Sequence, residues 1–205
     1  MSDSMIDELR TALAGVPQRD WLDDALARVR ADPDAIGPLF ARAERRLGRQ
    51  PLFPDSPWTA GRAGRALLLA EVADTRRTTT LYEQGDTAER LAVLAALPLI
   101  DAGPELVPLL HDALRSNDAR LVAAALGPYA AHLDAASWRQ GVVKCVFMGI
   151  PLSAVDRLDE RADPQLAAML GALAQERAAA DRRMPPDALA LLNRLTVANH
   201  SRKQA

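Results

Sequence analysis

RLAVLAALP, residues 90–98, and RLVAAALGP, residues 120–128, are two copies of one helical pattern. The copies start 30 residues apart, and an arginine, a leucine, an alanine and a proline fall at matching positions. A fixed period of roughly 20 to 50 residues is typical of stacked helix pairs, because one pair alone cannot bury its apolar face. The repeat therefore predicts an all-α fold, a HEAT-like superhelix of helix pairs.

The same helical periodicity extends in both directions from this stretch and defines the expected organisation. We predict an N-terminal helical cap over residues 1–50, a proline-rich connector over 51–58, a helical-repeat body over 59–198 and a disordered tail over 199–205. A chain of 205 residues can build one good core, so all four segments are expected to form one structural domain.

Two short patterns within the predicted body allow more local predictions. Gly61 and Gly64 lack the preceding strand and the remaining residues of a phosphate loop, so close helix packing is the favoured interpretation. The β-branched run from Thr78 to Tyr82 is short and predicts an extended loop. After it, Asp86 followed three positions on by Glu89 is a capping-box pattern that predicts a helix start.

Composition excludes several classes of function. The net charge is −2 and charged residues make up 25 %, so neither nucleic acid nor an anionic membrane is an expected partner. The single cysteine, Cys145, rules out an internal disulfide, and the scarce histidines leave no evident metal site, so no cofactor is expected. No apolar run approaches ~18 residues and no signal peptide is visible, which predicts a cytoplasmic protein without a transmembrane segment.

Lys144 is the strongest chemical anomaly in the sequence. It is one of two lysines, and no other charged residue lies between Arg139 and Asp156. If it faced the core, loss of water would perturb its pKa, as at many functional sites. The alternative is structural: the stem reaches water, or the ammonium forms an ion pair.

Polar residues also gather at the starts of the two repeated helices. If the pairs stack, equivalent helix ends lie side by side, and Arg90 and Arg120 could hold an anionic group such as a phosphate or carboxylate. The alternative is that the acids cap the helices and the arginines pair with them. Candidate ligand-binding residues are Tyr82, Arg90, Asn117, Arg120, Tyr129, Trp138 and Arg139; candidate catalytic residues are Lys144, Glu89 and Asp86.

Four segments of the central third together resemble the EboA family. They are YEQGDTAER (82–90), ALRSNDARLVAAALGPY (113–129), WRQ (138–140) and KCVFMGIP (144–151). The resemblance implies a bacterial protein of the ebo gene set, which accompanies a membrane prenyltransferase-like protein and predicted metabolic enzymes. It further implies a setting in the processing or export of specialised metabolites, but it supplies no catalytic residues.

We therefore expect an accessory protein of such a pathway, a helical scaffold that binds a small anionic metabolite or another protein of the ebo set. The absence of a recognised catalytic motif favours a non-enzymatic role. The alternative is a metabolic enzyme of that pathway, with Lys144, Glu89 or Asp86 as acid or base and an arginine holding an anionic substrate. Nucleic-acid binding would require a continuous basic stripe and a steep salt dependence.

Overall fold

The computed structural model describes the backbone of residues 2–54, 56–100 and 102–204 and the side chains of 3–54, 56–100 and 102–197. Within these residues all regular elements are helices, twelve α-helices and four short 3-10 helices. The chain divides into two compact units, Met1–Leu109 and Leu110–Ala205. The predicted all-α class is confirmed, whereas the HEAT-like superhelix stays a prediction.

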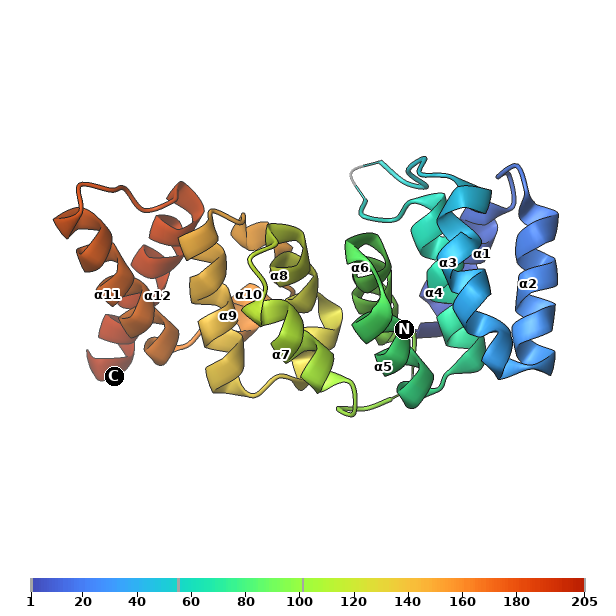
Figure 1. The fold of residues 1–205 in the computed structure, drawn as a ribbon. Helices are drawn as coiled ribbons and strands as arrows, with labels where there is room; N and C mark the ends of the chain where they lie inside the picture. Colours follow the sequence, from blue (N-terminus) through green and yellow to red (C-terminus); the bar gives the residue numbers. More distant parts are fainter. Residues whose placement is uncertain (1, 55, 101, 205) are drawn as a thin grey trace. The chain divides into compact units, whose positions relative to one another are not determined.

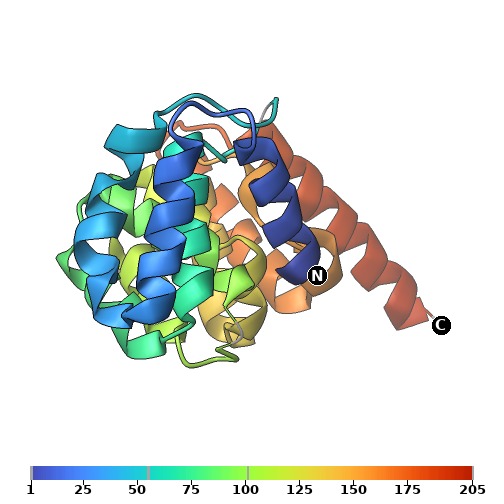
Figure 2. The ribbon, with the colours of Figure 1, turned by 90° about the vertical axis from the view of Figure 1, so that its right-hand side faces the viewer.

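The first unit is built around α4, which packs against α1, α2, α3 and α6. Figures 1 and 2 show α2 lying beside α3. Leu9, Phe40, Leu68 and Leu97 lie in its fully buried core. Its elements are α1 (Ser2–Leu13), α2 (Arg19–Ala31), η1 (Pro33–Ala35), α3 (Ile36–Leu47), α4 (Ala60–Val72), α5 (Thr75–Gln84), α6 (Thr87–Ala96) and η2 (Leu97–Leu99).

Close packing of α3 against α4 depends on the two glycines of α4. A Cβ atom at Gly61 would lie 2.7 Å from the Cα atom of Glu44, and one at Gly64 would overlap the Leu47 side chain. The prediction that these glycines serve helix packing is therefore confirmed. Between the two helices, the described residues of the predicted connector (51–54 and 56–58) form no helix, and Pro51 makes a bridge with Thr59.

The predicted extended loop from Thr78 to Tyr82 is wrong, because these residues lie within α5. Asp74 caps this helix by accepting a hydrogen bond from the backbone of Arg77. The hydroxyls of Thr78, Thr79 and Thr80 donate to carbonyls one turn earlier, which gives each hydroxyl a partner inside the helix. Local capping thus overrides the low helix propensity of threonine.

The second unit has its core around Trp138, Leu110, Leu126 and Leu166, all fully buried. In it α9 packs against α8 and α11, and α11 packs against α12. The predicted tail, 199–205, lies outside the residues whose side chains the structure describes. Helix α7 (Val107–Arg115) enters this unit at Leu110. The elements that follow are α8 (Ala119–Ala125), η3 (Pro128–His132), α9 (Ala135–Met148), η4 (Leu152–Ala154), α10 (Leu158–Arg161), α11 (Pro164–Ala179) and α12 (Pro186–Gln204).

Aspartates cap several of the helices, and the capping box predicted from Asp86 and Glu89 is confirmed. Asp86 and Glu89 form both hydrogen bonds of a capping box at α6, and Asp118 and Asp134 accept backbone N–H groups at α8 and α9. Each of these carboxylates satisfies amides that would otherwise lack a partner. None of the helices in the described part of the chain is long and apolar enough to cross a membrane.

Candidate functional site

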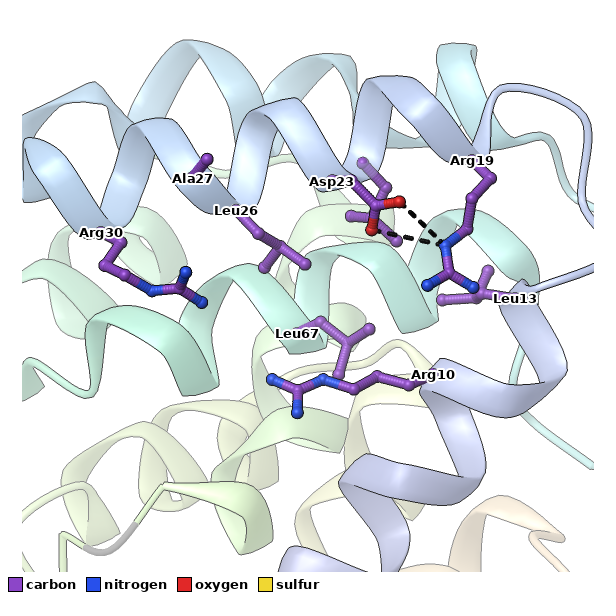
Figure 3. Close-up of a pocket in the computed structure, with 9 residues that line it drawn as sticks. Arg10, Leu13, Arg19, Asp23, Leu26, Ala27, Arg30 and Leu67 are labelled. Carbon is purple, nitrogen blue, oxygen red and sulfur yellow. Dashed lines mark hydrogen bonds and ion pairs between the residues drawn. The ribbon is translucent and has the colours of Figure 1, made fainter.

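A groove in the first unit brings together basic and apolar side chains (Figure 3). It has a volume of about 340 Å³ and lies where α1, α2 and α4 meet. Leucine side chains form its apolar wall, and three arginines project into it. The lining residues are Arg10, Leu13, Arg19, Leu22, Asp23, Leu26, Ala27, Arg30 and Leu67.

Helix geometry explains why these residues meet. Arg19 and Arg30 are eleven positions apart on α2, about three full turns, so their side chains leave the same face of the helix. Leu22 and Leu26 lie between them on that face. Arg10 comes from the last turn of α1, where a cation interacts favourably with the negative end of the helix.

Two carboxylates partly neutralise the three arginines. Arg19 Nε lies 3.1 and 3.3 Å from the two carboxylate oxygens of Asp23. Arg30 Nε donates to Glu71 Oε1 at 2.7 Å, and this hydrogen bond raises the pKa of the Arg30 guanidinium. Arg10 NH2 lies 3.8 Å from Glu71 Oε2, which is beyond hydrogen-bond distance.

Arg10 therefore keeps most of its hydrogen-bonding capacity. A guanidinium has five N–H donors, and within the described residues Arg10 makes only the long ion pair with Glu71. Its side chain is 49 % exposed and can reach a molecule in the groove. Three cations against two carboxylates leave one positive charge beside an apolar wall, an arrangement that suits an amphipathic monoanion.

A second groove, of about 580 Å³, lies in the second unit around α10 and the start of α12. Its charged side chains already have partners. Arg194 binds Asp159 and Arg157 binds Glu160, both at 2.6 Å. Asp187 accepts backbone N–H groups from Leu152 and Ala188. A ligand would have to displace one of these bonds, so this groove is the weaker candidate.

Lys144 has a structural role in the second unit. Its Nζ donates to the carbonyl oxygens of Leu114 at 2.6 Å and Ser116 at 2.8 Å, at the end of α7. Cations are favourable at helix C-termini, where the carbonyls lack intrahelical donors. The neighbouring Cys145 is fully buried, and burial raises the pKa of its thiol to about 11.

Arg90 also binds the end of a helix. Its guanidinium donates to the carbonyls of Gly85 and Glu83, both at 3.1 Å, and lies over the Tyr82 ring at 5.2 Å. Tyr82 itself is buried. These contacts bring together two of the residues named as ligand-binding candidates, but they direct Arg90 toward the end of α5.

Asp86 and Glu89 are occupied by the capping box, and Glu89 also faces a buried arginine. Glu89 Oε1 lies 3.5 Å from Arg65 NH2, and Arg65 NH1 donates to Glu44 Oε2 at 3.0 Å. Arg65 is only 4 % exposed. This ion cluster links α3, α4 and α6, and the sequence contained no signal for it beyond an arginine in an otherwise apolar helix.

The remaining candidates do not share one set of contacts. Arg120 binds the carboxylate of Asp118 at 2.6 Å and is 68 % exposed, so its contacts differ from those of Arg90 at the matching repeat position. Arg139 binds Asp163, the cap of α11, at 2.6 Å. Asn117 is exposed. Tyr129 and Trp138 are buried, next to His132 and Arg161 respectively.

No cluster of three or more side chains able to hold a metal ion occurs among the residues that the structure describes. The groove arginines were missed because they lie in the segment interpreted as a helical cap. The available signal was the spacing of Arg19, Leu22, Leu26 and Arg30 along one face of α2.

Comparison with known protein families identifies a relationship. A family model described as "Metabolite traffic protein EboA" matches residues 43–193, about three quarters of the chain. Neither the curated proteins nor the solved structures contain a match. The family was the one indicated by the four central segments of the sequence.

Proposed function

Because the chain belongs to the EboA family of metabolite-traffic proteins, we propose that it is a non-enzymatic accessory protein that binds a small anionic metabolite. The observation that carries the proposal is the groove of Arg10, Arg19 and Arg30 against its leucine wall. The family description supports a metabolite as the ligand, and the residual positive charge supports an anion. A pathway for specialised metabolites is the setting that we propose for this binding.

The groove suits a ligand with two parts. Its volume of about 340 Å³ lies at the lower end of the range typical of small-molecule sites. The leucines favour an apolar body, while Arg10 offers free donors to a carboxylate, sulfonate or phosphate monoester. The ligand anion would replace the long contact between Arg10 and Glu71 with a direct hydrogen bond.

The test uses a pair of fluorescent probes with similar apolar bodies. Anilinonaphthalene sulfonate carries one negative charge, and N-phenyl-naphthylamine carries none. We expect the sulfonate to bind the folded protein at one site and the neutral probe to bind at least roughly tenfold more weakly, the equivalent of one charge-assisted hydrogen bond.

Two variants assign the site. Arg10→Gln should weaken sulfonate binding by roughly tenfold, because it removes the uncommitted guanidinium. Arg28→Gln, on the same helix as Arg19 but outside the groove lining, should leave binding unchanged. Circular dichroism of both variants must match that of the parent protein, since partly unfolded proteins also bind such probes.

Equal binding of the two probes, or an unchanged affinity in Arg10→Gln, would contradict the proposal. If Arg157→Gln in the second groove weakened binding instead, the site would lie in the second unit. Turnover of a pathway intermediate by the purified protein alone would favour the enzymatic alternative with Lys144.

A further inference from the structure

The exposed face of α3 carries a row of three arginines. The row starts at Arg42, and Arg45 and Arg46 follow it by three and four positions. Residues at this spacing lie on one side of a helix. All three are exposed, and none takes part in a hydrogen bond or ion pair within the described residues. We call these three residues the α3 arginine row.

The opposite face of α3 is fully committed to the core of the first unit. Ile36, Leu39, Phe40, Ala43 and Leu47 are buried, where α3 packs against α2 and α4. In Figure 1 the front of α3 is not covered by another helix of its unit. The arginine row is thus presented on a rigid, well-packed element.

The carboxylates on α3 and just before it bind other arginines. Glu44 binds Arg65 and Arg49, and Asp34 binds Arg77 at 2.6 Å. Like charges three and four positions apart on a helix repel each other. Arg45 and Arg46 gain a favourable interaction with the C-terminal end of the helix, but Arg42 lies too far from that end to share it.

We propose that the α3 arginine row is a docking surface for an acidic helical segment of a partner protein. Arg42 and Arg46 are about 6 Å apart along the helix axis, one turn, and carboxylates on a facing helix have the same spacing. The proposal is independent of the metabolite groove, since none of the three arginines lines it.

Charge distribution favours a protein over a nucleic acid or a membrane. Residues 1–109 contain 13 arginines and 17 acidic residues, so the field around this unit does not attract polyanions at long range. A membrane-binding helix inserts apolar side chains, and those of α3 face the core. Short-range pairing with carboxylates needs neither long-range attraction nor insertion.

The test titrates the full chain with a synthetic alanine-based peptide that carries glutamates at alternating three- and four-residue spacing. A peptide of the same composition with the glutamates in one block serves as the comparison. We expect the patterned peptide to bind more tightly than the block peptide. Arg42→Gln/Arg45→Gln/Arg46→Gln should lose roughly tenfold in affinity for it, through three exposed ion pairs.

The control variant Arg28→Gln/Arg76→Gln removes two other exposed arginines of the same unit whose side chains make no hydrogen bond or salt bridge within the described residues. It should bind the patterned peptide like the parent protein. The single variant Arg42→Gln should lose about twofold to threefold, which keeps the test valid if the triple variant is poorly folded.

Three results would overturn the proposal. They are equal affinity for the two peptides, equal loss in the control variant, and preferential binding to a short DNA duplex or to phosphatidylglycerol vesicles. The last result would assign the row to a different anionic partner.

Discussion

The helix ends of the second unit and the groove of the first unit use basic side chains in different ways. In the second unit, Lys144, Arg161 and Arg177 donate to backbone carbonyls at the ends of α7, η3 and α9. In the first unit, Arg10 and Arg30 share one carboxylate at the side of an open groove. The first arrangement completes helix ends, whereas the second leaves donors available to a ligand.

This difference shows that a cation is available to bind a ligand only when the protein does not already supply acceptors for its N–H groups. A charge in an apolar helix, such as Lys144, stands out in the sequence, yet helix ends offer ready acceptors for it. The groove arginines do not stand out in the sequence, but the three guanidinium groups have only two carboxylates, Asp23 and Glu71, as partners. Substitutions of the cations that bind helix ends should therefore reduce stability, and those in the groove should reduce binding.

Loss of Lys144 should have the largest effect on stability. Lys144→Met keeps the length of the stem but removes both hydrogen bonds and leaves the carbonyls of Leu114 and Ser116 without this donor. We expect the free energy of unfolding to fall by about 2–3 kcal/mol, measured by urea denaturation. Arg10→Gln, the groove counterpart, should change it by less than about 0.5 kcal/mol.

An unchanged stability of Lys144→Met would remove the distinction between the two units. It would also return Lys144 to the list of candidate catalytic residues. Retention of probe binding in Lys144→Met, with lowered stability, would sharpen the distinction.

Cys145, which follows Lys144 in the same helix, should be chemically inert in the folded protein. Burial raises the pKa of its thiol to about 11, so only about one thiol in a thousand is ionised at pH 8. We expect iodoacetamide to leave the native chain unmodified and to label it once in urea, as detected by mass spectrometry. Rapid labelling of the native protein would show that the second unit opens easily.

Packing of α3 on α4 gives a matched pair of glycine substitutions. Gly61→Ala places a methyl group against the backbone of Glu44 and should cost about 1–3 kcal/mol of unfolding free energy. Gly171→Ala, in α11 of the second unit, meets no atom within 4 Å and should gain about 0.5–1 kcal/mol. Similar effects in both variants would contradict the close approach of α3 and α4.

Sequence analysis predicted much of the fold because helix caps and apolar spacing are local signals. The capping-box pattern of Asp86 and Glu89 predicted a helix start, and both of its hydrogen bonds form. The α5 helix was missed since three hydroxyl-to-carbonyl bonds offset the poor helix propensity of its threonines. The EboA family was recognised from the four central segments.

The candidate groove could not be predicted in the same way. Its arginines come from two helices, and two of them, Arg10 and Arg30, share the acceptor Glu71 on a third. The matching positions of Arg90 and Arg120 predicted matching roles, but their local acceptors differ. Arg90 binds carbonyls at the end of the preceding helix, and Arg120 binds the cap of its own helix. Spacing along a chain predicts which face a side chain occupies, but it does not predict which acceptors lie across from it.

The smallest expected effect is a difference between the two units in acid. Hydrogen bonds from Arg139 lower the pKa of Asp163, and those from Arg120 and Ser137 lower the pKa values of Asp118 and Asp134. In the first unit the backbone N–H of Arg77 lowers the pKa of Asp74. A carboxyl whose pKa is lower in the folded state stabilises the protein above its unfolded pKa, and this contribution is lost as the pH falls through the folded value.

With three such caps, the second unit should lose more hydrogen-exchange protection than the first as the pH falls from about 5 to about 3. Protection factors measured by mass spectrometry, corrected for intrinsic exchange, would report each unit separately. Asp163→Asn keeps a capping side chain but cannot titrate, so it should reduce the acid sensitivity of the second unit alone. Equal losses in both units, or an unchanged acid response in Asp163→Asn, would mean that these caps do not set the acid limit, because a group that no longer titrates cannot contribute to it.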